Sequence, residues 1–157
     1  MIGLKIVATI ACLLMAIAAI NVILVYVLYS VETPGSGIGD ILGFLPISLI
    51  GAVPFLVTAG FILSAVSRIA IATARNSVLR VRLAAGIGLL PIVVCGFWSG
   101  LGAAFLGMPP DSLAAKAVSI YQFTLVAACV GDLVVLVLAL ATSTRTGPGD
   151  SSHRPAT

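Results

Sequence analysis

Four long apolar segments alternate with short polar segments along the chain. They run from about residue 6 to 29, 41 to 66, 83 to 106 and 117 to 141. Each is long enough to supply the roughly 20 helical residues that cross the hydrocarbon core of a membrane. The pattern predicts an all-α membrane protein, a bundle of four transmembrane helices in one domain spanning residues 1–142.

The breaks between these segments hold turn-forming or charged residues. Residues 30–40 (SVETPGSGIGD) and 107–116 (GMPPDSLAAK) contain prolines and glycines, and both are expected to be short surface loops. The middle break, residues 67–82, is a basic loop, into which we expect the second and third helices to extend past the membrane, with a turn near Arg75-Asn76-Ser77. Its cations are Arg68, Arg75, Arg80 and Arg82. The polar residues 143–157 predict a disordered cytoplasmic tail.

The positions of the cations predict the orientation, because Lys and Arg near span ends are retained on the cytoplasmic side. Four spans place Lys5, the four arginines of the middle break, Arg145 and Arg154 on one side. The other side carries Lys116 together with Glu32, Asp40 and Asp111. We therefore expect a multi-pass protein of the cell inner membrane with both termini in the cytoplasm. Three spans would place either Lys5 or the tail arginines outside.

The first apolar segment could instead be a signal peptide, since Lys5 precedes it and Ala16-Ile17-Ala18 resembles a cleavage site. Its apolar run continues to Tyr29, well beyond the 7 to 15 residues of a typical signal core. We expect the segment to remain in the mature protein.

Composition agrees with a membrane protein: 61% of the residues are hydrophobic and 8% are charged, against about 25% charged in soluble domains. The net charge of +3 does not indicate a nucleic-acid partner, because the arginines flank apolar segments. Contact with lipid phosphates is the simpler interpretation of these arginines, and binding to an acidic surface of a partner is the alternative.

Small residues at four-residue spacing predict where helices pack closely, because backbones approach only where side chains are small. In the third segment Gly96 and Gly100 form a GxxxG pair that Ala104 extends. In the fourth, Gly131 follows Ala127, and Asp132 follows Ala128, at the same spacing. We expect the third helix to be central. The pattern does not distinguish contacts within one chain from contacts with another copy.

Asp132 is the only formally charged residue inside any of the four predicted spans, and it lies near the middle of the membrane. A carboxyl there opposes insertion by about 2.5 to 3.5 kcal/mol, and such residues are usually functional. Small neighbours such as Ala128 predict that it faces protein. Since no span holds a cation, we expect a neutral acid that donates a hydrogen bond. Its candidate partners are Asn21, Thr58, Ser99, a carbonyl freed by a proline within a span, or a group on another protein.

We expect no catalytic constellation, no metal site and no cofactor. Cys12, Cys95 and Cys129 form no C-x-x-C motif, and His153, the single histidine, lies in the tail. The favoured function is therefore a non-enzymatic partner of another membrane protein, acting through helix–helix association as an accessory subunit, anchor or immunity-type protein. The alternative is a small transporter or channel, built from copies of the chain, that uses Asp132. A membrane enzyme ranks third.

Overall fold

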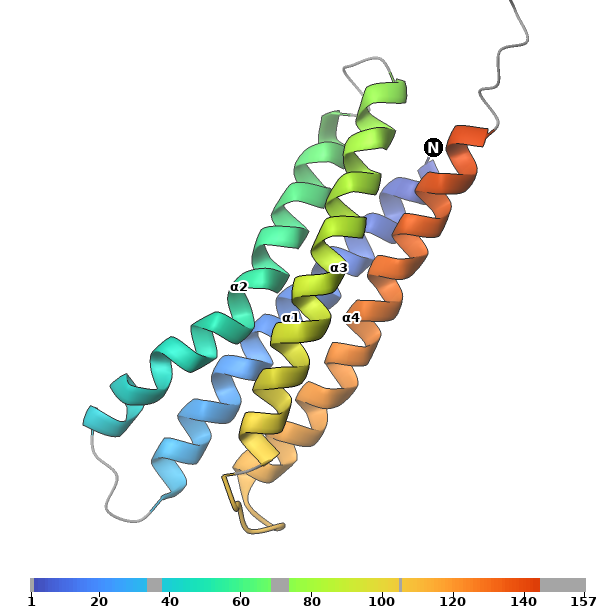
Figure 1. Ribbon diagram of the computed structural model, residues 1–157. Helices are drawn as coiled ribbons and strands as arrows, with labels where there is room; N and C mark the ends of the chain where they lie inside the picture. The colour runs from blue at the N-terminus through green and yellow to red at the C-terminus, as the bar shows by residue number, and fades with distance from the viewer. Residues whose placement is uncertain (1, 34–37, 69–73, 105, 145–157) are drawn as a thin grey trace, which may run out of the picture.

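The computed structural model describes residues 2–33, 38–68, 74–104 and 106–144, without the side chains at 40, 41, 74–77, 102–104, 143 and 144. Within these ranges the regular structure consists of α1 (Ile2–Glu32), α2 (Ile38–Arg68), α3 (Ala74–Ala104) and α4 (Leu113–Thr144) (Figure 1). All four helices are long and apolar enough to cross a membrane. The prediction of an all-α bundle with four such helices is confirmed.

Every helix begins before the apolar segment that predicted it, and three of the four end after it. The turn expected at Arg75-Asn76-Ser77 is wrong, because α3 already begins at Ala74. These residues are compatible with a first helical turn, since Arg has high helix propensity and neither Gly nor Pro interrupts them. The predicted loops are likewise shorter: Gly39 and Asp40 belong to α2, and Lys116 belongs to α4.

Predicted bounds follow hydropathy, whereas a helix can continue beyond the hydrocarbon wherever its residues tolerate helical geometry. The predicted tail illustrates the difference, because Ser143 and Thr144 still belong to α4. Residues 145–157, the rest of that tail, lie outside the described residues.

The helices alternate in direction and form a closed ring in which each helix packs against its two neighbours. α1 contacts α2 and α4, α3 contacts the same two helices, and α1 and α3 lie diagonally opposite with little contact. Figure 1 places the start of α1, the end of α2, the start of α3 and the end of α4 at one end of the bundle. We call this the basic end, because Lys5, Arg68, Arg80 and Arg82 lie there.

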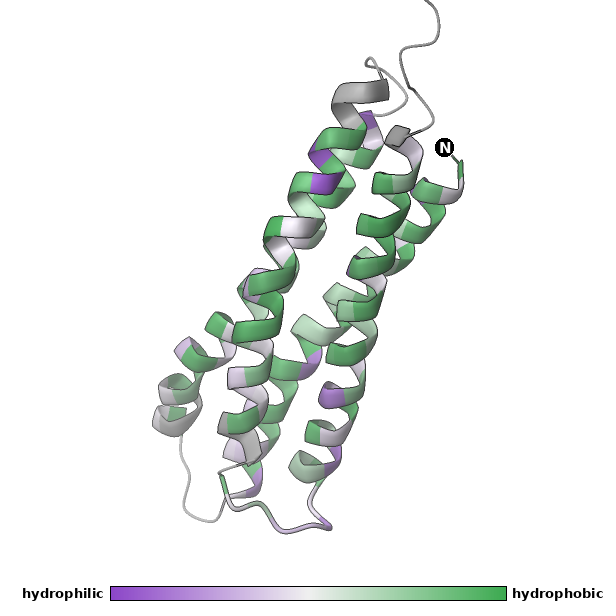
Figure 2. Cartoon of the chain, turned by 45° about the vertical axis from the view of Figure 1, so that its right-hand side comes forward, coloured by the Kyte–Doolittle hydropathy of each residue, from purple (hydrophilic) through white to green (hydrophobic). Residues whose placement is uncertain are grey.

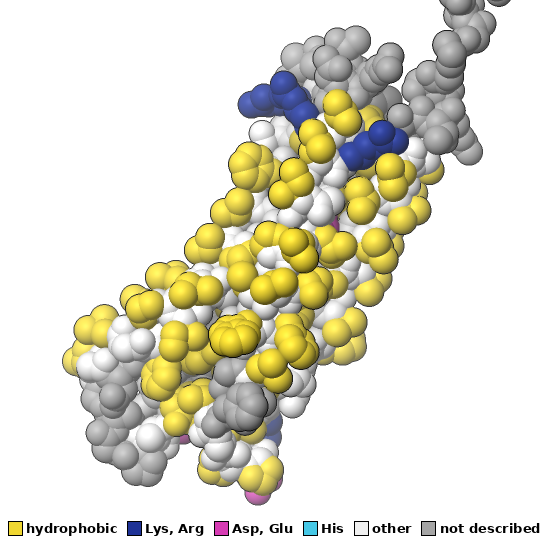
Figure 3. Space-filling view, viewed as in Figure 1, with side chains coloured by type: hydrophobic (Ala, Val, Ile, Leu, Met, Phe, Trp, Pro, Cys, Tyr) yellow, Lys and Arg dark blue, Asp and Glu magenta, His cyan; other side chains and the backbone are white. Residues whose placement is uncertain are grey.

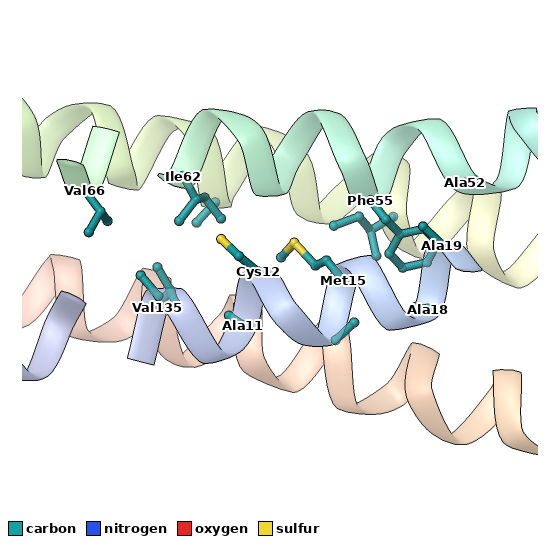
Figure 4. Packing of buried hydrophobic residues seen from close by; sticks show 14 of the residues in the cluster. Ala11, Cys12, Met15, Ala18, Ala19, Ala52, Phe55, Ile62, Val66 and Val135 are labelled. Carbon is teal, nitrogen blue, oxygen red and sulfur yellow. The ribbon is translucent and has the colours of Figure 1, made fainter. Parts of the chain in front are cut away.

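The most buried helix is α1, which corrects the expectation that the third helix is central. In the most apolar stretch of α1, 44% of the residues are buried, against 28% in α3. Ala8, Ala11 and Ala18 bring α1 close to its neighbours, and Cys12 and Met15 point toward α2 (Figure 4). A row of small residues facing two helices buries α1 more completely than the α3 glycines bury α3.

α2 bends along its length, and its first half leaves the bundle (Figure 1). Pro46 and Pro54 lie inside the helix, where each removes a backbone hydrogen bond. Among the described side chains of residues 38–50, Ser48 is buried, Phe44 is half-buried and the others are exposed. Phe44 holds this half of α2 to the bundle by stacking on Tyr26 of α1, with ring centroids 6.0 Å apart.

The outer surface of the bundle is largely apolar. Figure 2 shows hydrophobic residues along the middle of all four helices, with most hydrophilic residues toward the ends. Large side chains such as Ile87, Phe97, Trp98 and Phe123 are more than half exposed. Such a surface suits contact with lipid chains.

Candidate functional site

The carboxyl of Asp132 lies inside the bundle, just past the middle of α4. Its side chain is 0% exposed, as are Ala128 and Val135, about one turn before and after it. It therefore faces protein, as its small neighbours predicted. Neither Oδ1 nor Oδ2 has a hydrogen-bond partner among the described residues. A buried polar group is normally bonded, so this one marks a candidate site.

Two cysteines belong to the helices around this carboxyl: Cys129 precedes Asp132 by three residues in α4, and Cys12 lies in the neighbouring helix α1. The Sγ atom of Cys12 donates a hydrogen bond to the carbonyl oxygen of Ala59 in α2, at 3.4 Å. Figure 4 shows Cys12 directed at α2, near Ile62. The weak donor of Cys12 is therefore used elsewhere, and all three cysteines are free.

None of the three side chains expected as partners bonds to Asp132. Asn21 donates through Nδ2 to Thr124 Oγ1 at 3.3 Å. Thr58 packs directly against Gly88, and the side chain of Ser99 packs against Gly51. Each of these polar residues therefore joins two helices at a different point of the bundle. The sequence identified polar residues of the interior but could not pair them, because it carries no information on the register between helices.

The glycine row of α3 serves contacts within the chain. Tyr121 of α4 donates its hydroxyl to the Gly96 carbonyl at 2.8 Å. A Cβ added at Gly96 would lie 2.6 Å from Leu125 Cδ1, and one at Gly100 would lie 3.6 Å from Tyr121 Cε1. Ala104, which extends the row in the sequence, has a side chain outside the described set.

A second close contact joins α4 to α1. A Cβ added at Gly131 would lie 3.3 Å from Ala11 Cβ. Ala128 is fully buried one turn away. The small residues beside Asp132 therefore bring α1 against α4, and the carboxyl lies next to this contact.

Both ends of α4 are bonded by side chains from other helices, which the sequence did not reveal. At its start, the Leu113 and Ala114 amides donate to the two Glu32 carboxylate oxygens of α1, at 2.8 and 3.0 Å. About one turn before its end at Thr144, Arg82 of α3 donates from Nε to the Ala139 carbonyl and from a terminal nitrogen to the Leu140 carbonyl, each at 3.1 Å. A negative group near the start of a helix and a positive group near its end both interact favourably with the helix dipole.

The four arginines of the predicted basic loop are all helical, as the expected extension of the second and third helices implies, except that Arg75 lies in α3 where a turn was expected. Arg68 ends α2, and Arg75, Arg80 and Arg82 belong to α3. Arg82 is bound to α4, whereas Arg68 and Arg80 are exposed. The side chain of Arg75 lies outside the described set.

Among the described residues, no three His, Cys, Asp or Glu side chains lie close enough together to hold a metal ion. Comparison of the chain with protein-family models, curated proteins and solved structures finds no match. The fold and the site thus define a class: an all-α bundle of four apolar helices, each able to cross a membrane, with one unpaired carboxyl inside.

Proposed function

We propose that this chain is a non-enzymatic protein of the cell inner membrane that works through helix–helix association with another membrane protein. In this role it is an accessory subunit, an anchor or an immunity-type protein. Both termini lie in the cytoplasm in this proposal. Its support is the position of Lys5, Arg68, Arg80 and Arg82 at the basic end, where the positive-inside tendency favours the cytoplasm.

The observation that carries the proposal is an uncovered glycine pair on the first half of α2. Gly39 and Gly43 lie one turn apart, and a Cβ added at either would have no described atom within 4 Å. This part of α2 diverges from the bundle (Figure 1), and no described residue covers the glycine pair. The GxxxG pair of α3, by contrast, is occupied by Tyr121 and Leu125.

Such a glycine pair favours a second helix because it lets two backbones approach closely. This surface is not predictable from the sequence pattern, which assigns residues 30–40 to a loop. Ile47 and Ile50 continue the uncovered side of α2 and are 43% and 61% exposed. A partner helix can therefore contact α2 over several turns.

The test is purification of tagged protein from its native membrane in mild detergent, with the co-purifying proteins and the mass of the complex measured. A partner recovered in fixed ratio with the wild type is expected to decrease on the order of tenfold with Gly43→Leu. Gly60→Leu is the matched control, since Gly60 also lies in α2 with no described atom near an added Cβ. Equal loss in both variants, or no partner with the wild type, would contradict the proposal.

The unpaired Asp132 favours a second candidate function, passage of a proton or cation. Ionisable residues inside a membrane commonly mark proton or ion pathways. Asp132 is enclosed within one chain, so in this candidate function each copy would conduct the proton or cation through its own interior. It would not conduct through a channel formed between copies. In proteoliposomes, Asp132→Asn is then expected to abolish flux while the protein still assembles. Undiminished flux in that variant would remove this candidate.

A further inference from the structure

A groove with a volume of about 700 Å³ runs between α2 and α3 on the outside of the bundle. Its walls are mostly apolar. α2 contributes Val53, Pro54 and Phe61, and α3 contributes Leu83, Ile87 and Pro91. The two helices touch where Thr58 packs against Gly88, and both residues belong to the groove lining. The groove therefore opens toward the region that lipid chains occupy.

The α3 wall of the groove is about as long as one leaflet of a bilayer, and the α2 wall is somewhat longer. At about 1.5 Å per residue, the α2 wall from Val53 to Arg68 is about 22 Å long and the α3 wall from Pro91 to Arg80 about 16 Å. One leaflet contributes about 15 Å of the roughly 30 Å hydrocarbon core. The groove thus begins at the basic end and stops near the middle of the bundle.

The mouth of the groove is positively charged. Arg68 and Arg80 line it there, and both side chains are exposed. No Asp or Glu is among the described residues that line the groove. Figure 3 shows dark blue Lys and Arg side chains at this end, above a face that is almost entirely hydrophobic. Arg82 differs, because it is bonded to the end of α4.

We propose that this groove binds an anionic phospholipid, with an acyl chain between α2 and α3 and the headgroup phosphate at Arg68 and Arg80. Basic sites between transmembrane helices on the cytoplasmic side suit anionic headgroups. A free phosphate would leave the apolar walls unfilled, whereas a phospholipid places a phosphate at the charged mouth and an acyl chain along these walls. This inference is independent of the proposed partner surface, which lies on the first half of α2.

The experiment is native mass spectrometry of the delipidated protein titrated with phosphatidylglycerol or, separately, phosphatidylcholine. We expect one phosphatidylglycerol per chain to be retained at concentrations where phosphatidylcholine is not. Arg68→Gln and Arg80→Gln are each expected to weaken phosphatidylglycerol binding about fivefold, because each Lys or Arg near an anionic headgroup strengthens binding by roughly that factor. Lys116→Gln removes an equal charge at the other end and leaves binding unchanged.

A second pair of variants tests the apolar part of the site. Ser64→Trp fills the groove and is expected to expel the lipid, whereas Leu63→Trp, at an adjacent exposed position outside the lining, is not. Equal binding of the two lipids by the wild-type protein would overturn the proposal without any variant. A dimer that Ser64→Trp dissociates would also overturn it, because a second copy would then be the occupant.

Discussion

Asp132 is the position at which a single side chain opposes the stability of the bundle. It is fully buried, and its two oxygens have no partner among the described residues. A buried polar group without a hydrogen bond costs about 1 to 3 kcal/mol of folding free energy. A structural clasp between helices would have the opposite effect, so stability separates the two roles that the sequence left open.

Asp132→Val is therefore expected to raise the free energy of unfolding by about 1 to 3 kcal/mol, because it replaces the carboxyl with an apolar group of similar size. Reversible unfolding in detergent micelles measures this change. Val135→Ala, at a buried position on the same side of α4, serves as control and is expected to lower stability by roughly 1 to 3 kcal/mol. If Asp132→Val also lowers stability, the carboxyl is a clasp.

At the scale of the elements, α4 depends on its neighbours at both ends. Its own residues do not supply the charges that stabilise helix ends, since its first turn holds no acidic residue and its last turn no basic residue. Glu32 of α1 accepts two amide hydrogen bonds at its start, beside Ser112, whose hydroxyl accepts from the Ala115 amide at 3.0 Å. The beginning of α4 is thus fixed by one local and one distant residue.

Glu32→Ala is expected to lower the free energy of unfolding by about 1 kcal/mol, because it leaves two amides of the first turn without their charged acceptor. Chemical unfolding monitored by circular dichroism measures the loss. Asp111→Ala removes an exposed carboxyl near the same end and should stay within about 0.5 kcal/mol of the wild type. Equal losses of stability in the two variants would show that the loss comes from removing negative charge at this end of the bundle and not from removing the hydrogen bonds of Glu32.

The sequence predicted the elements better than the contacts between them. Four apolar runs gave four helices, and small residues near Asp132 correctly predicted its burial. Gly39 was assigned to a loop because glycine and proline cluster around it, although it belongs to α2. The pairing of Glu32 with α4 and of Tyr121 with Gly96 depends on tertiary register, which no local pattern encodes.

At the scale of the whole molecule, the helices alternate in direction, so each end of the bundle holds one end of every helix. The basic end and the opposite end, which carries Glu32 and Asp111, differ in charge. If the proposed orientation is correct, the two ends are accessible from different sides of the membrane. This is a property of the assembled protein and not of any one helix.

Cysteine labelling tests this orientation in a variant whose three native cysteines are replaced. A membrane-impermeant maleimide is expected to label Asp111→Cys in cells whose inner membrane is intact, and Ser67→Cys only after that membrane is permeabilised. Both positions are exposed, so differences in burial do not explain the result. The reverse pattern would place the termini outside.

The bonds at the two ends of α4 also set an order of assembly. α4 is synthesised after α1 and α3, so the side chains that bind it, Glu32 and Arg82, are already present when it emerges. α1 and α3 lie diagonally opposite in the bundle, so the two side chains that bind α4 come from separate helices on either side of it. Until α4 is in place, Glu32 and Arg82 lack these hydrogen-bond partners, so both bonds form only when the fourth helix joins the other three.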